Sequence, residues 1–192
     1  KEDNKTDSVL KKYWHTNIME LYTQVIDLIK YYDGNNDFTT LNNEIFVCSL
    51  KTYKEQLFEH IYKTSYAIKL KNTKAIYEVL VNISLLCLNH MNNMDEKNSK
   101  SIIIETNRLL FQKKNTDYGN SFVDCGLIGV LVRLNDKINR LLTLLSSSNQ
   151  NSSNMQVNDE RIEDTINDLY NYCIIALTYK YVNEVSKNEQ VL

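Results

Sequence analysis

The segment 159–185 carries the residues best suited to chemistry. On a helical wheel with about 100° between successive residues, four carboxylates and two amides fall on one stripe: Glu160, Glu163, Asp164, Asp168, Asn167 and Asn171. The later part of the segment, residues 172–177, is apolar on every side, which indicates a buried helix. Because the helix must be buried there, we expect the acidic stripe two turns earlier to face a cleft rather than open water.

Carboxylates at this spacing could hold a divalent cation. Asp164 lies four residues from both Glu160 and Asp168, and like charges at that separation repel by about 0.2–0.5 kcal/mol per pair. A bound cation would reverse this cost, and Mg²⁺ is typically held by one or two carboxylates together with substrate phosphates. The alternative is a solvated acidic face at a helix start, where acids suit the helix dipole. The spacing alone leaves both alternatives open.

The segment 126–145 predicts an amphipathic helix with a leucine-rich core stripe. Its opposite face carries Arg133, Asp136, Lys137 and Arg140. One interpretation is a metal carboxylate, Asp136, flanked by cations that contact phosphates. The alternative is a helix face in which Asp136 forms ion pairs with Arg133 and Arg140 on the same helix.

Glycines are concentrated just before this helix. Three of the four, Gly119, Gly126 and Gly129, lie within eleven residues that follow the string Asp117-Tyr118. Glycine lets backbone amides approach a ligand closely, so the segment 115–126 is either a phosphate- or base-contacting loop or an ordinary turn between helices. Motifs of zinc hydrolases, Walker A proteins and serine esterases are absent from the sequence.

The elements that would position these residues are expected to be helices. The 192 residues include no Pro and only four Gly, and folds rich in strands need more turn breakers than that. We expect an all-α bundle of six helices, with Ser8 capping the first and Gly34 ending it, a polar hinge at 92–99 and a mobile loop at 146–158. The predicted helices are 8–32, 40–65, 70–92, 99–114, 126–145 and 159–185.

Charge and cysteine content restrict the partners. The net charge of −2 argues against a protein that binds nucleic acid or an anionic membrane through its bulk charge. Four separated cysteines without a CxxC pair indicate reduced thiols in an intracellular, cytoplasmic protein. No apolar run approaches the roughly 20 residues that cross a bilayer. No signal peptide is visible, although the sequence begins at Lys1 and a preceding segment stays an open alternative.

Three segments resemble the nucleotide modification associated domain 1 family of phage and bacterial proteins. That family's pattern is K-x-x-D-Y-G-x-S, then R-L-x-D-K-x-x-R, then E-x-x-x-D-T-x-x-D-L-x-N-Y. The corresponding segments here are 109–122 (LLFQKKNTDYGNSF), 126–144 (GLIGVLVRLNDKINRLLTL) and 160–177 (ERIEDTINDLYNYCIIAL). The family in turn resembles the all-α NTP pyrophosphohydrolases, the MazG and dimeric dUTPase superfamily. The resemblance implies a MazG-like core at 99–186, with 1–95 as an N-terminal extension or part of the bundle.

The resemblance also implies a function. It suggests a homodimeric pyrophosphohydrolase that converts an NTP or dNTP to the monophosphate and pyrophosphate with Mg²⁺, for which Mn²⁺ could substitute. The implied alternative is a non-catalytic nucleotide-binding or protein-interaction module, since Arg133-x-x-Asp136 stands where the superfamily has ExxE. Metal would be bound by Asp136, Glu160, Glu163, Asp164 and Asp168, of which Asp136, Glu163 and Asp168 would be catalytic. Substrate would be bound by Lys114, Asp117, Tyr118, Arg133, Lys137, Arg140 and Asn171.

Overall fold

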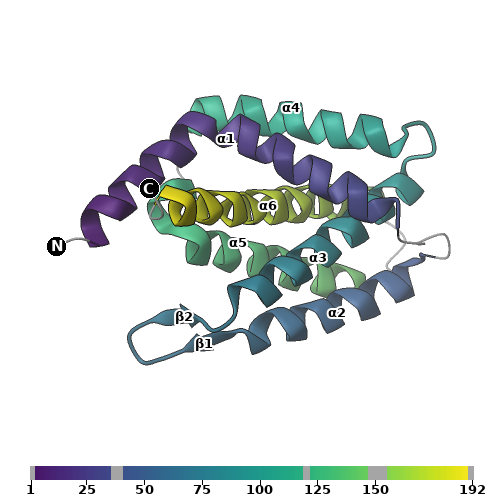
Figure 1. The fold of residues 1–192 in the computed structure, drawn as a ribbon. Coiled ribbons are helices and arrows are strands. Elements are labelled where there is room, and N and C mark those ends of the chain that lie inside the picture. Colours follow the sequence, from purple (N-terminus) through teal and green to yellow (C-terminus); the bar gives the residue numbers. More distant parts are fainter. Residues whose placement is uncertain (1–2, 36–40, 119–121, 147–154, 190–192) are drawn as a thin grey trace.

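The predicted all-α class is confirmed. The computed structural model describes residues 3–35, 41–118, 122–146 and 155–189, and within them the chain forms six helices and one short hairpin (Figure 1). The helices are α1 (Asp3–Asp33), α2 (Asn43–Glu59), α3 (Thr73–Met94), α4 (Lys100–Tyr118), α5 (Phe122–Leu145) and α6 (Met155–Glu189). The hairpin consists of β1 (Ile61–Lys63) and β2 (Ile68–Leu70). None of the described helices is long and apolar enough to span a membrane.

Helix α6 lies in the middle of the bundle (Figure 1) and packs against α1, α3 and α5. Its segment 173–178 is buried, as its apolar sequence predicts, and so are most residues of α3 from Ile76 to Met91. One hydrophobic core contains side chains from both halves of the chain. The indole Nε1 of Trp14 on α1 donates to the hydroxyl of Thr178 on α6 over 2.8 Å, which fixes the first helix onto the central one.

Several helix ends differ from the prediction. Helix α1 begins at Asp3, so Ser8 lies inside it and the predicted cap is wrong. Its predicted end at Gly34 is confirmed, because Asp33 is the last helical residue and the Gly34 amide donates to the Lys30 carbonyl. Asparagine side chains cap two other helices: Asn42 accepts from an amide of α2 and Asn72 from an amide of α3. Such caps satisfy amides that otherwise have no partner in the helix.

The predicted helix over 40–65 is wrong beyond Glu59. The chain leaves the helix at His60 and forms the β1–β2 hairpin, with Tyr62 opposite Lys69 in the antiparallel register. β-branched and aromatic residues favour strands, and the turn is closed by Thr64, whose amide donates to the carbonyl of Ala67. Sequence periodicity missed the hairpin because its strands are only three residues long.

The connections around the predicted site are shorter than expected. Residues 95–99 of the predicted polar hinge 92–99 connect α3 and α4, whereas residues 92–94 belong to the end of α3. Helix α4 continues to Tyr118 and α5 begins at Phe122, so most of the predicted loop is helical, with a kink at Gly126 where φ is +62°. That positive φ explains why glycine stands there. Residues 119–121, including Gly119, and most of the predicted loop 146–158 lie outside the described residues.

Candidate functional site

The polar stripe of α6 faces two different neighbours. Glu163 and Asn167 line a cavity that α6 forms with α3 and α4. Asp168 points to the other side, where its Oδ2 lies 2.9 Å from Nζ of Lys137 on α5. Residues 163 and 168 are five positions apart, about 140° around the helix. The stripe predicted as one face is therefore divided between a cavity and an interhelical ion pair.

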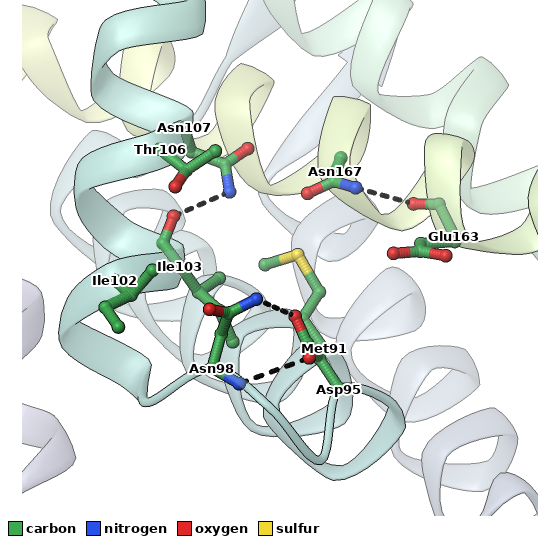
Figure 2. Close-up of a pocket in the computed structure, with 9 residues that line it drawn as sticks. All are labelled: Met91, Asp95, Asn98, Ile102, Ile103, Thr106, Asn107, Glu163 and Asn167. Atoms are coloured by element: carbon green, nitrogen blue, oxygen red, sulfur yellow. Dashed lines mark hydrogen bonds between the residues drawn. The ribbon is translucent and has the colours of Figure 1, made fainter.

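The cavity has a volume of about 140 Å³ and is partly open to solvent. An engineered cavity of about 150 Å³ accommodates benzene, so this one has room for a single ring. Figure 2 shows Met91 pointing into the space between α4 and α6, with amide side chains around it. The lining residues are Met91, Asp95, Asn98, Ile102, Ile103, Thr106, Asn107, Glu163 and Asn167.

The polar lining is held in place by local hydrogen bonds (Figure 2). The Asp95 carboxylate accepts from the amide and the side chain of Asn98, which fixes the turn after α3. Asn107 Nδ2 donates to the Ile103 carbonyl over 2.9 Å, and Asn167 donates to the Glu163 carbonyl over 3.1 Å. A wall with fixed amides and an apolar side can position a flat polar ring, because the amides supply both donors and acceptors.

Glu163 is the available charged group of this cavity. Within the described residues its carboxylate makes no hydrogen bond and no ion pair, and its side chain is exposed. Asp95, the other carboxylate, already accepts three hydrogen bonds from the turn after α3. Glu163 is therefore the carboxylate that can act on a bound ligand or help bind a cation.

A hydrogen-bond network inside the protein reaches the cavity lining at Asn107. The Tyr22 hydroxyl donates to Asn171 Oδ1 over 2.6 Å, and Asn171 Nδ2 donates to Asn107 Oδ1 over 2.8 Å. The Tyr22 ring stacks on Phe111 with 4.7 Å between centroids. Burial raises the pKa of Tyr22 well above its usual value, so the hydroxyl stays protonated and donates. Asn171, which is predicted to bind substrate, is hydrogen-bonded inside the protein, where it orients Asn107.

The face of α5 that carries Arg133, Lys137 and Arg140 has one ion pair among the described residues, from Lys137 to Asp168. Arg133, Asp136 and Arg140 are exposed, and among the described residues neither predicted ion pair of Asp136 along α5 is formed. Lys137 pairs across to Asp168 on α6, so α5 and α6 are joined by charge as well as by apolar packing. The exposed guanidinium groups are free to bind phosphate, which Arg contacts through paired donors.

The remaining predicted residues lie around these features. Glu160 and Asp164 are exposed on α6. Lys114 is exposed on α4, one turn before its end. The side chains of Asp117 and Tyr118, in the last turn of α4, lie outside the described residues. The structure therefore brings Glu163 to the cavity and Asp168 to Lys137, and it leaves Asp136, Glu160 and Asp164 on the surface.

The predicted metal site is larger than the described side chains support. In those parts of the chain, no three Asp, Glu, His or Cys side chains lie close enough together to hold one metal ion. Mg²⁺ commonly keeps several waters and binds through one or two carboxylates plus phosphates. Glu163 and Asp164 are both exposed, so either carboxylate is available for that smaller kind of site. The five-carboxylate set stays a prediction.

Sequence reasoning missed the part of the cavity that comes from α3 and α4. Asp95 and Asn98 were interpreted only as a hinge, although their spacing is typical of a turn in which a carboxylate binds amides that follow it. Asn107 was not singled out, yet it is a buried amide within a helix. A buried polar side chain needs a partner, and that requirement was the signal available for Asn107.

The comparisons with known proteins support the resemblance for part of the chain. Residues 114–179 match the family model described as nucleotide modification associated domain 1, which covers about a third of the sequence. The match runs from the end of α4 through α5 into α6 and contains every predicted site residue. It leaves out α3 and most of α4, which build the other wall of the cavity. No curated protein and no solved structure matches the chain significantly.

Proposed function

We propose that the chain binds a nucleotide beside α6 and, with Mg²⁺, hydrolyses it to a nucleoside monophosphate and pyrophosphate. The observation that carries the proposal is Glu163, an exposed carboxylate without a partner among the described residues, at the edge of a cavity that fits one ring. The match of residues 114–179 to a nucleotide-associated family supports a nucleotide as the ligand.

The base or sugar would occupy the cavity between α4 and α6. Ile103 and Met91 offer apolar contact to the face of a ring, while Asn98 and Asn167 offer hydrogen bonds to its edge. The network from Tyr22 through Asn171 keeps Asn107 in one orientation. Discrimination between ligands is strongest where a fixed polar group loses its partner in the wrong complex.

The phosphates would extend across the exposed ridge of α6 toward α5. There Arg133, Arg140 and Lys137 supply positive charge, and Asp168 holds the Lys137 ammonium in position. Glu163 and Asp164 are the residues that would hold a magnesium ion together with phosphate oxygens. The chemistry that such an ion supplies is activation of water and neutralisation of charge on the leaving pyrophosphate.

The homodimer implied by the resemblance stays part of this proposal. Helix α4 exposes three aliphatic side chains, Ile102, Leu109 and Leu110, and an isologous contact through such a helix face would be self-complementary. Light scattering over a concentration series tests the dimer separately from the activity.

The activity is tested by incubating the protein with a panel of NTPs and dNTPs and following pyrophosphate release with and without Mg²⁺. We expect Glu163→Gln to lower kcat about 10²-fold or more, the usual effect of removing a group that acts on the reacting water. Glu20→Gln, on an exposed carboxylate of α1, is the matched control and should keep wild-type turnover. No turnover of any nucleotide by the wild-type protein would refute the enzymatic proposal.

A non-catalytic nucleotide-binding module is the second candidate. It is favoured by the Lys137–Asp168 ion pair, which occupies one of the three predicted catalytic carboxylates, and by the lack of a three-carboxylate cluster in the described part of the chain. This candidate predicts calorimetric nucleotide binding without hydrolysis. Turnover that is lost in Glu163→Gln but kept in Glu20→Gln would exclude it.

A further inference from the structure

The β1–β2 hairpin and its flanks form the most basic stretch of the described chain. Residues 60–74 contain four lysines and no carboxylate. Without these four, the chain's 22 basic residues fall to 18 against 24 acidic ones, so positive charge is concentrated in a protein that is otherwise acidic. Such a local patch can attract an anionic partner although the net charge of the whole chain is −2. We call residues 60–74 the basic hairpin.

The basic hairpin has an anchored face and an outward face. Ile61 is buried, and Ile68 and Leu70 pack against the core, which anchors the hairpin to the bundle. In the antiparallel register Tyr62 is opposite Lys69, and directly opposed residues project from the same face of a sheet. The Lys71 ammonium lies 5.4 Å from the centroid of the Tyr62 ring. The outward face therefore combines one aromatic ring with two lysines.

A second aromatic ring stands at the turn of the hairpin. Tyr66 is 99% exposed and Tyr62 is 37% exposed. Lysines on short edge strands often serve only to prevent strands from pairing between molecules. That role accounts for the lysines but not for Tyr66. Because the Tyr66 ring is almost fully exposed, it contributes no burial to stability, and a ligand could stack on it.

The basic hairpin is remote from the cavity described above. Its last two residues, Thr73 and Lys74, begin α3, whereas Met91 lines the cavity near the other end of that helix. Met91 lies eighteen positions after Thr73, which corresponds to about 27 Å of helix. In Figure 1 the hairpin extends beyond the ends of α2 and α3 at one end of the bundle. The basic hairpin is therefore separate from the proposed nucleotide site.

We propose that the basic hairpin binds single-stranded nucleic acid. Proteins that bind single strands combine lysine or arginine contacts to phosphates with aromatic rings on which bases stack. Both components are present here: four lysines in Lys63, Lys69, Lys71 and Lys74, and two exposed rings. An anionic membrane is a weaker fit, because insertion needs exposed aliphatic side chains and those of the hairpin face the core.

The test uses fluorescence anisotropy with labelled oligo(dT) and oligo(U) of about 15 nucleotides, within the usual site size. With four phosphate contacts, we expect log K to fall against log salt with a slope of about −3. Lys69→Gln with Lys71→Gln, the two lysines of the outward face, should reduce the magnitude of that slope by about 1.4. Tyr66→Ala should weaken binding about 5- to 100-fold through lost stacking, with the slope unchanged.

Matched controls separate the hairpin from general charge and aromatic effects. Lys12→Gln with Lys97→Gln removes two exposed lysines elsewhere, and Tyr31→Ala removes an exposed ring of α1; both should bind like wild type. Circular dichroism verifies that each variant is folded. The proposal is overturned if the wild-type protein fails to bind either oligonucleotide at low salt, if hairpin and control variants bind equally, or if phosphatidylserine vesicles bind while the oligonucleotides do not.

Discussion

The two halves of α6 perform different tasks along one continuous helix. Residues 160–171 carry the polar stripe that lines the cavity and pairs with α5, whereas residues 173–178 are buried without exception. The buried half ties α6 to α1 through the Trp14–Thr178 hydrogen bond. Rigid support directly adjacent to exposed polar groups is what a precise binding site requires. Substitutions in the first half should therefore affect ligands, and those in the second half should affect stability.

The largest effect on stability is expected from the buried half. Leu177 is completely buried, so Leu177→Ala should lower the free energy of unfolding by about 2–5 kcal/mol through lost burial and the cavity left behind. Leu109→Ala removes the same atoms from a side chain that is 51% exposed and should change stability by less than about 0.5 kcal/mol. Urea unfolding measures both. Equal losses of unfolding free energy in Leu177→Ala and Leu109→Ala would contradict the burial of Leu177.

A pH effect is expected from His90 on α3, the helix that packs beside α6. Burial lowers the pKa of His90 to about 4, its ring packs against Phe46, and Nε2 lies 3.0 Å from Asn43 Oδ1. The unfolded chain takes up this proton near pH 6.5 and the folded chain only near pH 4. The contribution of His90 to the free energy of unfolding is therefore fully present above about pH 6.5. It falls by about 3 kcal/mol as the pH drops to 4.

Unfolding of wild type and His90→Gln at pH 7, 5 and 4 measures this contribution. The variant should lose less stability than wild type over that range, because it has no buried imidazole to protonate. His60→Gln, a histidine outside the core, is the control and should follow wild type. Identical pH profiles for wild type and His90→Gln would show that His90 does not titrate as its burial implies.

Two buried tyrosines, Tyr22 of α1 and Tyr170 of α6, lie near the border between the two halves of α6. Tyr22→Phe leaves Asn171 Oδ1 without its 2.6 Å donor and should cost about 1–3 kcal/mol. The Tyr170 hydroxyl, in contrast, is buried without a hydrogen-bond partner in the described structure. Tyr170→Phe removes an unsatisfied group, so it should leave stability unchanged or raise it by about 1 kcal/mol. If Tyr170→Phe destabilises as much as Tyr22→Phe, the hydroxyl has a partner.

The smallest effect is expected at the ion pair of the first half. Asp168 and Lys137 are both partly exposed, and pairs of this kind contribute about 0–1 kcal/mol. Asp168→Asn should therefore barely change the unfolding midpoint, while it weakens nucleotide binding by releasing Lys137 from its position. Calorimetric titration of nucleotide into the variant measures this separation of stability from binding. A stability loss as large as that of Leu177→Ala would instead assign Asp168 a structural role.

Much of the fold could be predicted from the sequence, because helical periodicity is a local property. The apolar run at 83–88 is buried as expected, and so are residues 173–177 of the all-round apolar segment, whereas Tyr172 at its start is half-buried. The hairpin could not be predicted in this way, since Ile61 and Tyr62 continue the periodicity of α2 and only the packing of the strands shows that the helix has ended.

The candidate site could be predicted only in part. The wheel places Glu163 and Asp168 on the same stripe, but it does not show which helices lie beside each. Asn107 comes to the cavity from a distant part of the sequence and is oriented by Asn171, a contact that no local pattern encodes. The tertiary arrangement of α3, α4 and α6, rather than the motif itself, determines which polar groups meet.

The most direct test is a crystal structure of the protein with Mg²⁺ and a non-hydrolysable nucleoside triphosphate. If the proposed function is correct, the base or sugar will lie in the cavity beside Ile103 and Asn167, the phosphates toward Lys137, and Glu163 at the metal or its water. A nucleotide bound elsewhere, with the cavity between α4 and α6 filled only by water, would contradict it.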